Sequence, residues 1–153
     1  MRAKTVWVVV ADGARARILS ADRRTRRLTP IEELASETAR RKTSDLVSDR
    51  QGRTFESSSP GHRSAIEPHT DAQRHEQAEF ARQVAQKLAA AAHEQRFDEL
   101  YLVAAPRALG DLRAALTEEV SQRIVGEMDK DLTSLTVPQL EEHFWTKLAS
   151  GGK

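Results

Sequence analysis

The first apolar run of the chain is Thr5-Val6-Trp7-Val8-Val9-Val10-Ala11, and Asp12-Gly13-Ala14-Arg15-Ala16-Arg17-Ile18-Leu19-Ser20 follows it at once. A short, almost continuously apolar and β-branched run is typical of a strand that is buried on both faces of a sheet. Asp12-Gly13 is a tight-turn dipeptide, and the alternating residues behind it predict the second arm of a hairpin. The segment therefore predicts a central strand and its antiparallel neighbour.

The rest of the chain predicts a mixed sheet with helices on its faces. After a charged turn at 22–27, residues 28–34 predict a third strand, and Pro30 favours the sheet edge because proline cannot donate to a ladder. The later pattern predicts a helix from Thr70 to about Arg96, a strand over 100–104, a helix from Pro106, a strand over 124–128 and a helix capped by Thr136 and Gln139. We therefore expect one α/β domain over residues 1–150 and a frayed tail at 151–153.

The composition excludes several kinds of site. The 153 residues contain no cysteine, which rules out disulfides, zinc–thiolate sites, iron–sulfur clusters and a cysteine nucleophile. The apolar run over 6–11 is too short for a membrane span, and no small-residue cleavage site follows it. We therefore expect a cytoplasmic protein without a membrane segment.

The charges are unevenly distributed along the chain. Residues 1–63 carry 14 Lys and Arg against 8 Asp and Glu, whereas residues 64–153 carry 10 against 15. A basic half is typical of proteins that bind an anionic partner such as nucleic acid. The alternative is a solvated surface whose charges balance across the folded molecule.

A long basic segment lies between the predicted third strand and the first long helix. Residues 36–69 show no sustained period, and loops of this length are usually functional or disordered. Its cationic side chains, which could contact phosphates, are Arg40, Arg41, Lys42, Arg50, Arg53, His62 and Arg63. Gly52 and Gly61 would let the backbone approach a ligand closely. This segment is therefore the candidate nucleic-acid-binding site.

Other chemistries find weaker support. The chain has neither a GxxxxGK[ST] nor a GxGxxG motif, which argues against nucleotide-binding loops, and no GxSxG nucleophile elbow. Asp12 stands where a two-metal nuclease would place one carboxylate, but the end of the next central strand offers none. The histidines at 62, 69 and 75 have no established metal-ligand spacing. No metal and no cofactor are expected.

Five stretches together resemble the bacterial host-attachment protein family, over nearly the whole chain. They are Val8-Val9-Val10-Ala11-Asp12-Gly13-Ala14-Arg15-Ala16-Arg17, Glu67-Pro68-His69-Thr70-Asp71, Phe80-Ala81-Arg82, Leu102-Val103-Ala104-Ala105-Pro106-Arg107 and Glu127-Met128-Asp129-Lys130-Asp131-Leu132-Thr133. That family is similar in turn to the central domain of archaeal and eukaryotic peptide-chain release factors, with ribonuclease H-like topology. The resemblance implies a strand meander, a glycine-rich loop, a long helix and further β–α units.

In release factors that loop carries Gly-Gly-Gln, which helps water cleave peptidyl-tRNA. The corresponding stretch here is Gly61-His62-Arg63-Ser64-Ala65-Ile66, so His62 replaces the second glycine and Arg63 replaces the glutamine. The stop-codon-reading and partner-binding domains of full release factors have no counterpart in 153 residues. The resemblance thus implies a release-factor-like core without a complete Gly-Gly-Gln motif.

Three hypotheses follow from these observations. The first is a translation-associated module that binds ribosomal RNA or tRNA through the basic segment. The second is a protein-interaction or regulatory factor that is required indirectly for attachment to host cells and binds a protein partner. The third is a peptidyl- or aminoacyl-tRNA ester hydrolase with His62 as the base. No oligomeric state is predicted.

Overall fold

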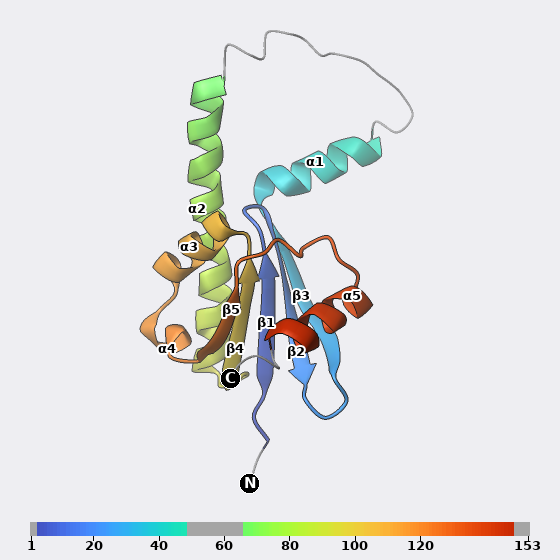
Figure 1. Ribbon diagram of the computed structural model, residues 1–153. Coiled ribbons are helices and arrows are strands. Elements are labelled where there is room, and N and C mark those ends of the chain that lie inside the picture. The colour runs from blue at the N-terminus through green and yellow to red at the C-terminus, as the bar shows by residue number, and fades with distance from the viewer. Residues whose placement is uncertain (1–2, 49–65, 149–153) are drawn as a thin grey trace.

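The computed structural model describes the backbone of residues 3–48 and 66–148 and the side chains of residues 3–42 and 71–148 (Figure 1). Five strands form one mixed sheet in the order β3-β2-β1-β4-β5. They are β1 (Val6–Ala11), β2 (Arg15–Asp22), β3 (Arg27–Ala35), β4 (Glu99–Ala104) and β5 (Ile124–Met128). The first three strands are antiparallel neighbours, whereas β1 and β4, and β4 and β5, run parallel. The predicted mixed sheet is confirmed, with β1 at its centre.

The alternation of side chains along β1 creates two cores. Val9 belongs to a cluster with residues of α2 (Ile66–His93), α3 (Pro106–Ala115) and α4 (Glu118–Ser121), including Leu88 of α2. Val8 belongs to a second cluster with Leu140 of α5 (Val137–His143) and Phe144 of the π-helical turn η3 (Phe144–Leu148). Successive strand residues point to opposite faces, so a fully apolar strand requires helices on both sides. Helices do cover both faces (Figure 1).

Two helix starts lie where the sequence predicts them, and a third has a side-chain cap. Pro106 occupies the first turn of α3. The Thr117 side chain accepts a hydrogen bond from the Val120 backbone N–H at the start of α4. At α5, the Thr136 hydroxyl accepts from the Gln139 N–H at 3.3 Å and the Gln139 side chain accepts from the Thr136 N–H at 2.9 Å. This capping box is confirmed.

The edge position of β3 is also confirmed, and the strand contains a bulge. Ile18 pairs with Glu32 and Leu19 with Pro30, so Ile31 is the extra residue. A bulge and a proline both interrupt the ladder that an edge strand would offer to another chain.

The predicted loop over residues 36–69 is wrong for residues 37–48, which form α1 (Glu37–Ser48). Ser36 precedes the helix, and its hydroxyl accepts a hydrogen bond from the Ala39 N–H at 3.1 Å. Ser36 therefore acts as the N-cap, and Glu37 adds a negative charge at the positive end of the helix dipole. A cap without an apolar period behind it gave too little signal to predict a helix.

The bounds of α2 also differ from the prediction. The helix begins at Ile66, so Thr70 lies within it and not at its N-cap. Pro68 falls in the first turn, where backbone N–H groups have no intrahelical partner and a proline is tolerated. The helix ends at His93 and not near Arg96, because Gln95 adopts a left-handed backbone with φ of 60°. Among the described helices, none is long and apolar enough to cross a bilayer.

Candidate functional site

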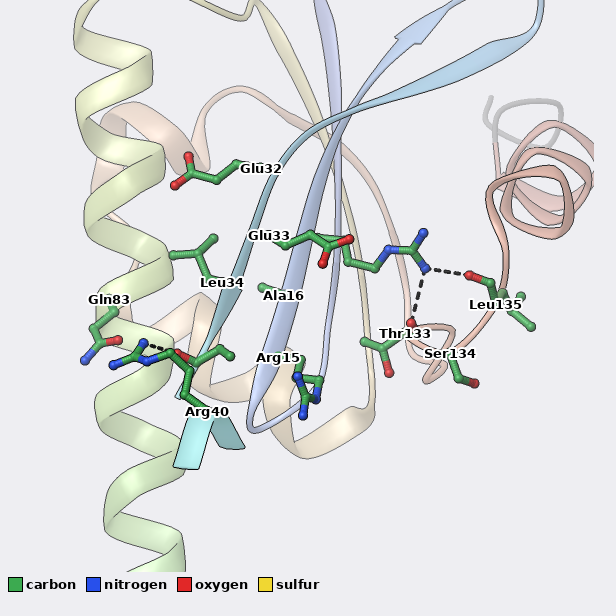
Figure 2. Close-up of a pocket in the computed structure, with 12 residues that line it drawn as sticks. Arg15, Ala16, Glu32, Glu33, Leu34, Arg40, Gln83, Thr133, Ser134 and Leu135 are labelled. Carbon is green, nitrogen blue, oxygen red and sulfur yellow. Dashed lines mark hydrogen bonds between the residues drawn. The ribbon is translucent and has the colours of Figure 1, made fainter. Parts of the chain in front are cut away.

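A groove of about 570 Å³ lies at one end of the sheet, around the last residues of β3. The residues of this sheet-end groove used below are Arg15, Arg17, Glu32, Glu33, Arg40, Gln83, Thr133 and Leu135. Figure 2 shows Gln83 and Arg40 on the α2 side, with Thr133 and Leu135 on the opposite side of the sheet. The groove therefore wraps around an edge strand and takes its walls from both faces.

The β1–β2 hairpin turn positions Arg15 at this groove. The Asp12 Oδ1 atom accepts hydrogen bonds from the backbone N–H groups of Ala14 and Arg15, both at 2.8 Å. The Asp12 N–H donates to the Arg15 carbonyl at 2.9 Å. An aspartate that binds its own turn in this way fixes the backbone at little cost. The exposed Arg15 side chain thus begins from a well-defined position.

Arg17 connects β2 to the segment between β5 and α5. Its Nη1 atom donates to the carbonyl oxygens of Leu135 at 2.6 Å and Thr133 at 3.2 Å. Guanidinium carries five N–H donors in a planar fork, so Nε and Nη2 stay oriented for another acceptor. Glu33 is its cross-strand partner on β3 and brings a negative charge to this wall. Arg17 is therefore both a structural link and an oriented cation.

The three consecutive basic residues of α1 point in different directions. Arg40 turns back onto the end of β3, where its Nη1 donates to the Ala35 carbonyl at 2.9 Å. Arg41 lies 3.8 Å from Glu37, and both side chains are about two-thirds exposed, so this pair contributes little. Lys42 lines a separate hollow of about 240 Å³ between α1, α2 and the hairpin. Of the three, only Arg40 lines the sheet-end groove.

A carboxylate of α2 anchors the first turn of α1. Glu76 accepts hydrogen bonds from the Thr38 hydroxyl at 2.8 Å and from the Thr38 N–H at 3.0 Å. These two bonds, the hydroxyl first, hold the pKa of Glu76 below its ordinary value of 4.5. Burial opposes them, while the Ser36 hydroxyl and the charge of Arg41 act in the same direction. The ionised form of Glu76 therefore strengthens the contact between α2 and the first turn of α1, the helix that carries Arg40.

We expect the docking of α1 to weaken in acid. Because the folded pKa is depressed, the stabilisation is complete above about pH 4.5 and is lost as the pH falls through the folded pKa. Hydrogen exchange at the Ala39 and Arg40 amides, followed from neutral to acidic pH, measures this directly. Glu76→Gln is the control because it cannot titrate, so its protection should respond much less to pH. Equal acid sensitivity in both proteins would contradict the assignment.

Asp12 stabilises the hairpin turn through its Oδ1 atom, and its Oδ2 atom lies close to the Thr133 hydroxyl. Thr133 Oγ1 lies 3.2 Å from Asp12 Oδ2 and 2.6 Å from Asp131 Oδ1, and its one proton serves one carboxylate at a time. Within residues 3–42 and 71–148, no group of three His, Asp or Glu side chains is placed to hold a metal ion. The carboxylates at this end therefore orient the backbone.

The remaining predicted residues of the basic segment are Arg50, Gly52, Arg53, Gly61, His62 and Arg63, and all lie outside the described residues. The ester-hydrolase hypothesis, which depends on His62, stays a prediction. The sequence-based prediction missed Arg15, Arg17 and Gln83. A signal was present for the first two, because arginines two positions apart on a strand share one face. No local signal indicates Gln83, which reaches the groove from the middle of α2.

Fold and site together define a small α/β domain with an arginine-lined groove at one end of a mixed sheet. The chain belongs to the family of proteins required for attachment to host cells, because the family model matches residues 7–144. The match runs from β1 to the start of η3 and covers every residue of the groove. A comparison with curated proteins gave no match.

Proposed function

We propose that this host-attachment-family chain is a small RNA- or ribosome-binding protein associated with translation, and that its sheet-end groove contacts RNA phosphates. The observation that carries the proposal is that Arg15, Arg17 and Arg40 all line one groove, Arg17 and Arg40 from its opposite sides. Guanidinium groups match phosphate geometry through paired hydrogen bonds and keep their charge at every physiological pH. Three of them at one groove favour a polyanionic ligand.

The acidic residues of the groove do not cancel this preference. Glu32 is paired with Lys87 of α2 at 2.9 Å, so its charge is already compensated. Glu33 lies opposite Arg17 on the neighbouring strand. A phosphate is therefore expected nearer to Arg15 and Arg40, at the hairpin end of the groove.

The arrangement of the sheet supports a relation to the central domain of release factors. A three-strand meander, a long helix and further parallel β–α units are what that resemblance implies. The chain has the meander β1–β2–β3, then α2, then β4 and β5 parallel to β1. We propose on this basis that the fold is of the ribonuclease H-like type that the resemblance implies, and that the domain acts on the translation apparatus.

Ribosome co-sedimentation at low and moderate salt tests the proposal. We expect the wild-type protein to pellet with ribosomes in a salt-sensitive manner, because phosphate binding releases condensed counterions. In Arg15→Ala/Arg40→Ala, the slope of log affinity against log salt should fall by roughly 1.5, since each phosphate contact contributes about 0.7–0.9. Arg107→Ala/Lys130→Ala removes the same charge from exposed positions outside the groove and should behave as wild type. Wild-type protein that stays in the supernatant at both salts would contradict the proposal.

A second candidate function is binding of a protein partner, as expected for a factor that is required indirectly for attachment. The observation that favours it is the position of the two large hydrophobic side chains exposed in the described residues. Ile31 on β3 is 37% exposed and Val125 on β5 is 48% exposed, and these strands form the two edges of the sheet. Because a bulge interrupts the ladder at each of these residues, a partner would contact the two exposed side chains and not extend the sheet. A partner whose capture survives nuclease treatment and is lost in Ile31→Asp or Val125→Asp would favour this function.

A further inference from the structure

The turn between β2 and β3 carries four arginines at the end of the sheet opposite the groove (Figure 1). Its sequence is Asp22-Arg23-Arg24-Thr25-Arg26-Arg27, which we name the arginine turn. A hollow of about 520 Å³ lies between this turn and the N-terminal segment, and Lys4, Arg23 and Arg24 line it. Nothing in the chemistry of the sheet-end groove uses these side chains.

The backbone of the arginine turn is held in place by the turn itself. The Asp22 carboxylate accepts hydrogen bonds from the N–H groups of Arg24 at 2.8 Å and Thr25 at 3.3 Å. The Asp22 carbonyl accepts from the Arg26 N–H at 2.8 Å, and Arg26 adopts a left-handed backbone with φ of 60°. A ligand that binds here therefore meets a preformed turn and does not have to order a flexible one.

Most acidic groups at this end already have donors. Glu99 forms ion pairs with Arg23 at 2.8 Å and with Lys4 at 3.3 Å. Asp98 and Glu141 each accept a backbone N–H at 2.8 Å, from Thr5 and Leu28 respectively. Each of these carboxylates is therefore bonded to a donor of the protein itself.

Three arginine side chains of the turn are exposed to solvent. Arg24, Arg26 and Arg27 are exposed and form no ion pair within the described part of the chain. The Arg26 guanidinium lies over the ring of Trp145, 5.7 Å from its centroid, which restrains the side chain and leaves its N–H groups available. The Asp22 carboxylate offsets part of the Arg24 charge, and the exposed cations that remain produce a positive field at this end.

We propose that the arginine turn is a second contact surface for the phosphates of single-stranded RNA. This inference rests on the proposed function and extends it to the other end of the sheet. The length of β2 separates the turn from Arg15 by roughly 24 Å, at about 3.4 Å per residue. One RNA strand could follow the sheet edge and contact both ends. RNA is favoured over a membrane surface because Ile31 and Val125, the exposed large hydrophobics of the described residues, lie outside the turn. Arginine planes can also stack against unpaired bases.

Fluorescence anisotropy with a labelled single-stranded RNA of about 16 nucleotides, a length near the upper site size of small binding domains, tests the inference. We expect Arg24→Ala/Arg27→Ala to bind roughly fivefold more weakly and to lower the salt slope by about 1.4, or 0.7 per lost contact. Arg24→Lys/Arg27→Lys keeps the charge and should retain the wild-type slope. Neither arginine supports the turn through its side chain, so thermal unfolding should be unchanged in both variants.

The outcomes separate the inference from the function on which it rests. Arg107→Ala/Lys130→Ala is the control for loss of two positive charges. If wild type binds and the turn variant matches that control, the arginine turn is not a contact surface, while the function stands. If wild type shows no salt-dependent binding, the proposed function and the inference both fail. Displacement of the RNA by poly-glutamate as readily as by unlabelled RNA would show an unselective anion surface and contradict the RNA assignment.

Discussion

Phe97→Ala is expected to lower the free energy of unfolding by about 3–5 kcal/mol, the usual cost of removing a buried phenylalanine ring. Phe97 is fully buried just before β4, and its ring stacks on Trp7 with centroids 5.0 Å apart. The Arg123 guanidinium lies over the same ring and donates to the Phe97 carbonyl at 2.6 Å. Loss of the ring would leave a cavity beside Trp7, whereas the bond from Arg123 to the backbone carbonyl of residue 97 would remain.

Urea unfolding followed by tryptophan fluorescence measures this loss, and the melting temperature should fall by about 10 °C for a domain of this size. Val125→Ala is the control because Val125 is 48% exposed, and surface substitutions usually change stability by about 0.5 kcal/mol or less. A Phe97→Ala protein within about 1 kcal/mol of wild type would mean that the site collapses around the smaller side chain.

Gly126→Ala is expected to destabilise the protein by about 1–3 kcal/mol through overpacking. A Cβ atom at Gly126 would lie 2.8 Å from the Cδ1 and Cε1 atoms of Tyr101, closer than real Cβ contacts allow. Tyr101 is buried and packs edge-on against Phe144 with centroids 5.0 Å apart. The ring must therefore shift to admit one methyl group, which disturbs its packing against Phe144. Because Tyr101 is the only tyrosine of the chain, its near-ultraviolet signal reports the shift.

Gly110→Ala provides a matched control, because it should change the stability in the opposite direction. Gly110 lies within α3, and a Cβ atom there would meet nothing within 4 Å. Alanine should stabilise that helix by about 0.5–1 kcal/mol. In a Tyr101→Leu background the cost of Gly126→Ala should largely disappear. An equal cost in both backgrounds would show that the backbone of β5, and not the Tyr101 ring, excludes the side chain.

The proposed function and the inference assign different tasks to the two ends of the sheet. At one end Arg15 and Arg17 of β2 and Arg40 of α1 line one groove. At the other, the arginine turn displays its cations from one continuous segment. A protein that holds one RNA strand at both ends would bind it more tightly than either end alone, because the second contact becomes intramolecular.

The strands of this protein were largely predictable from local pattern. The run over 6–11 is apolar at every position, and only a strand covered on both faces can bury such a run. Pro30 indicates an edge, Pro106 a first helical turn, and Thr136 with Gln139 a capping box, because each is a property of a few neighbouring residues. The predicted start of α2 at Thr70 is four residues late, since Pro68 is compatible with a first helical turn as well as with a loop.

The amino-acid sequence by itself determined the α/β class, the central strand and the absence of cysteine chemistry, because these depend on composition and short-range pattern. The tertiary structure decided which cations line the same groove. Arg17 reaches the Thr133 carbonyl 116 positions away, and no local rule contains that contact. Arg40, Arg41 and Lys42 are adjacent in the sequence but diverge, because successive residues of a helix point about 100° apart. The first turn of α1 donates two hydrogen bonds to Glu76, a carboxylate that a distant helix supplies.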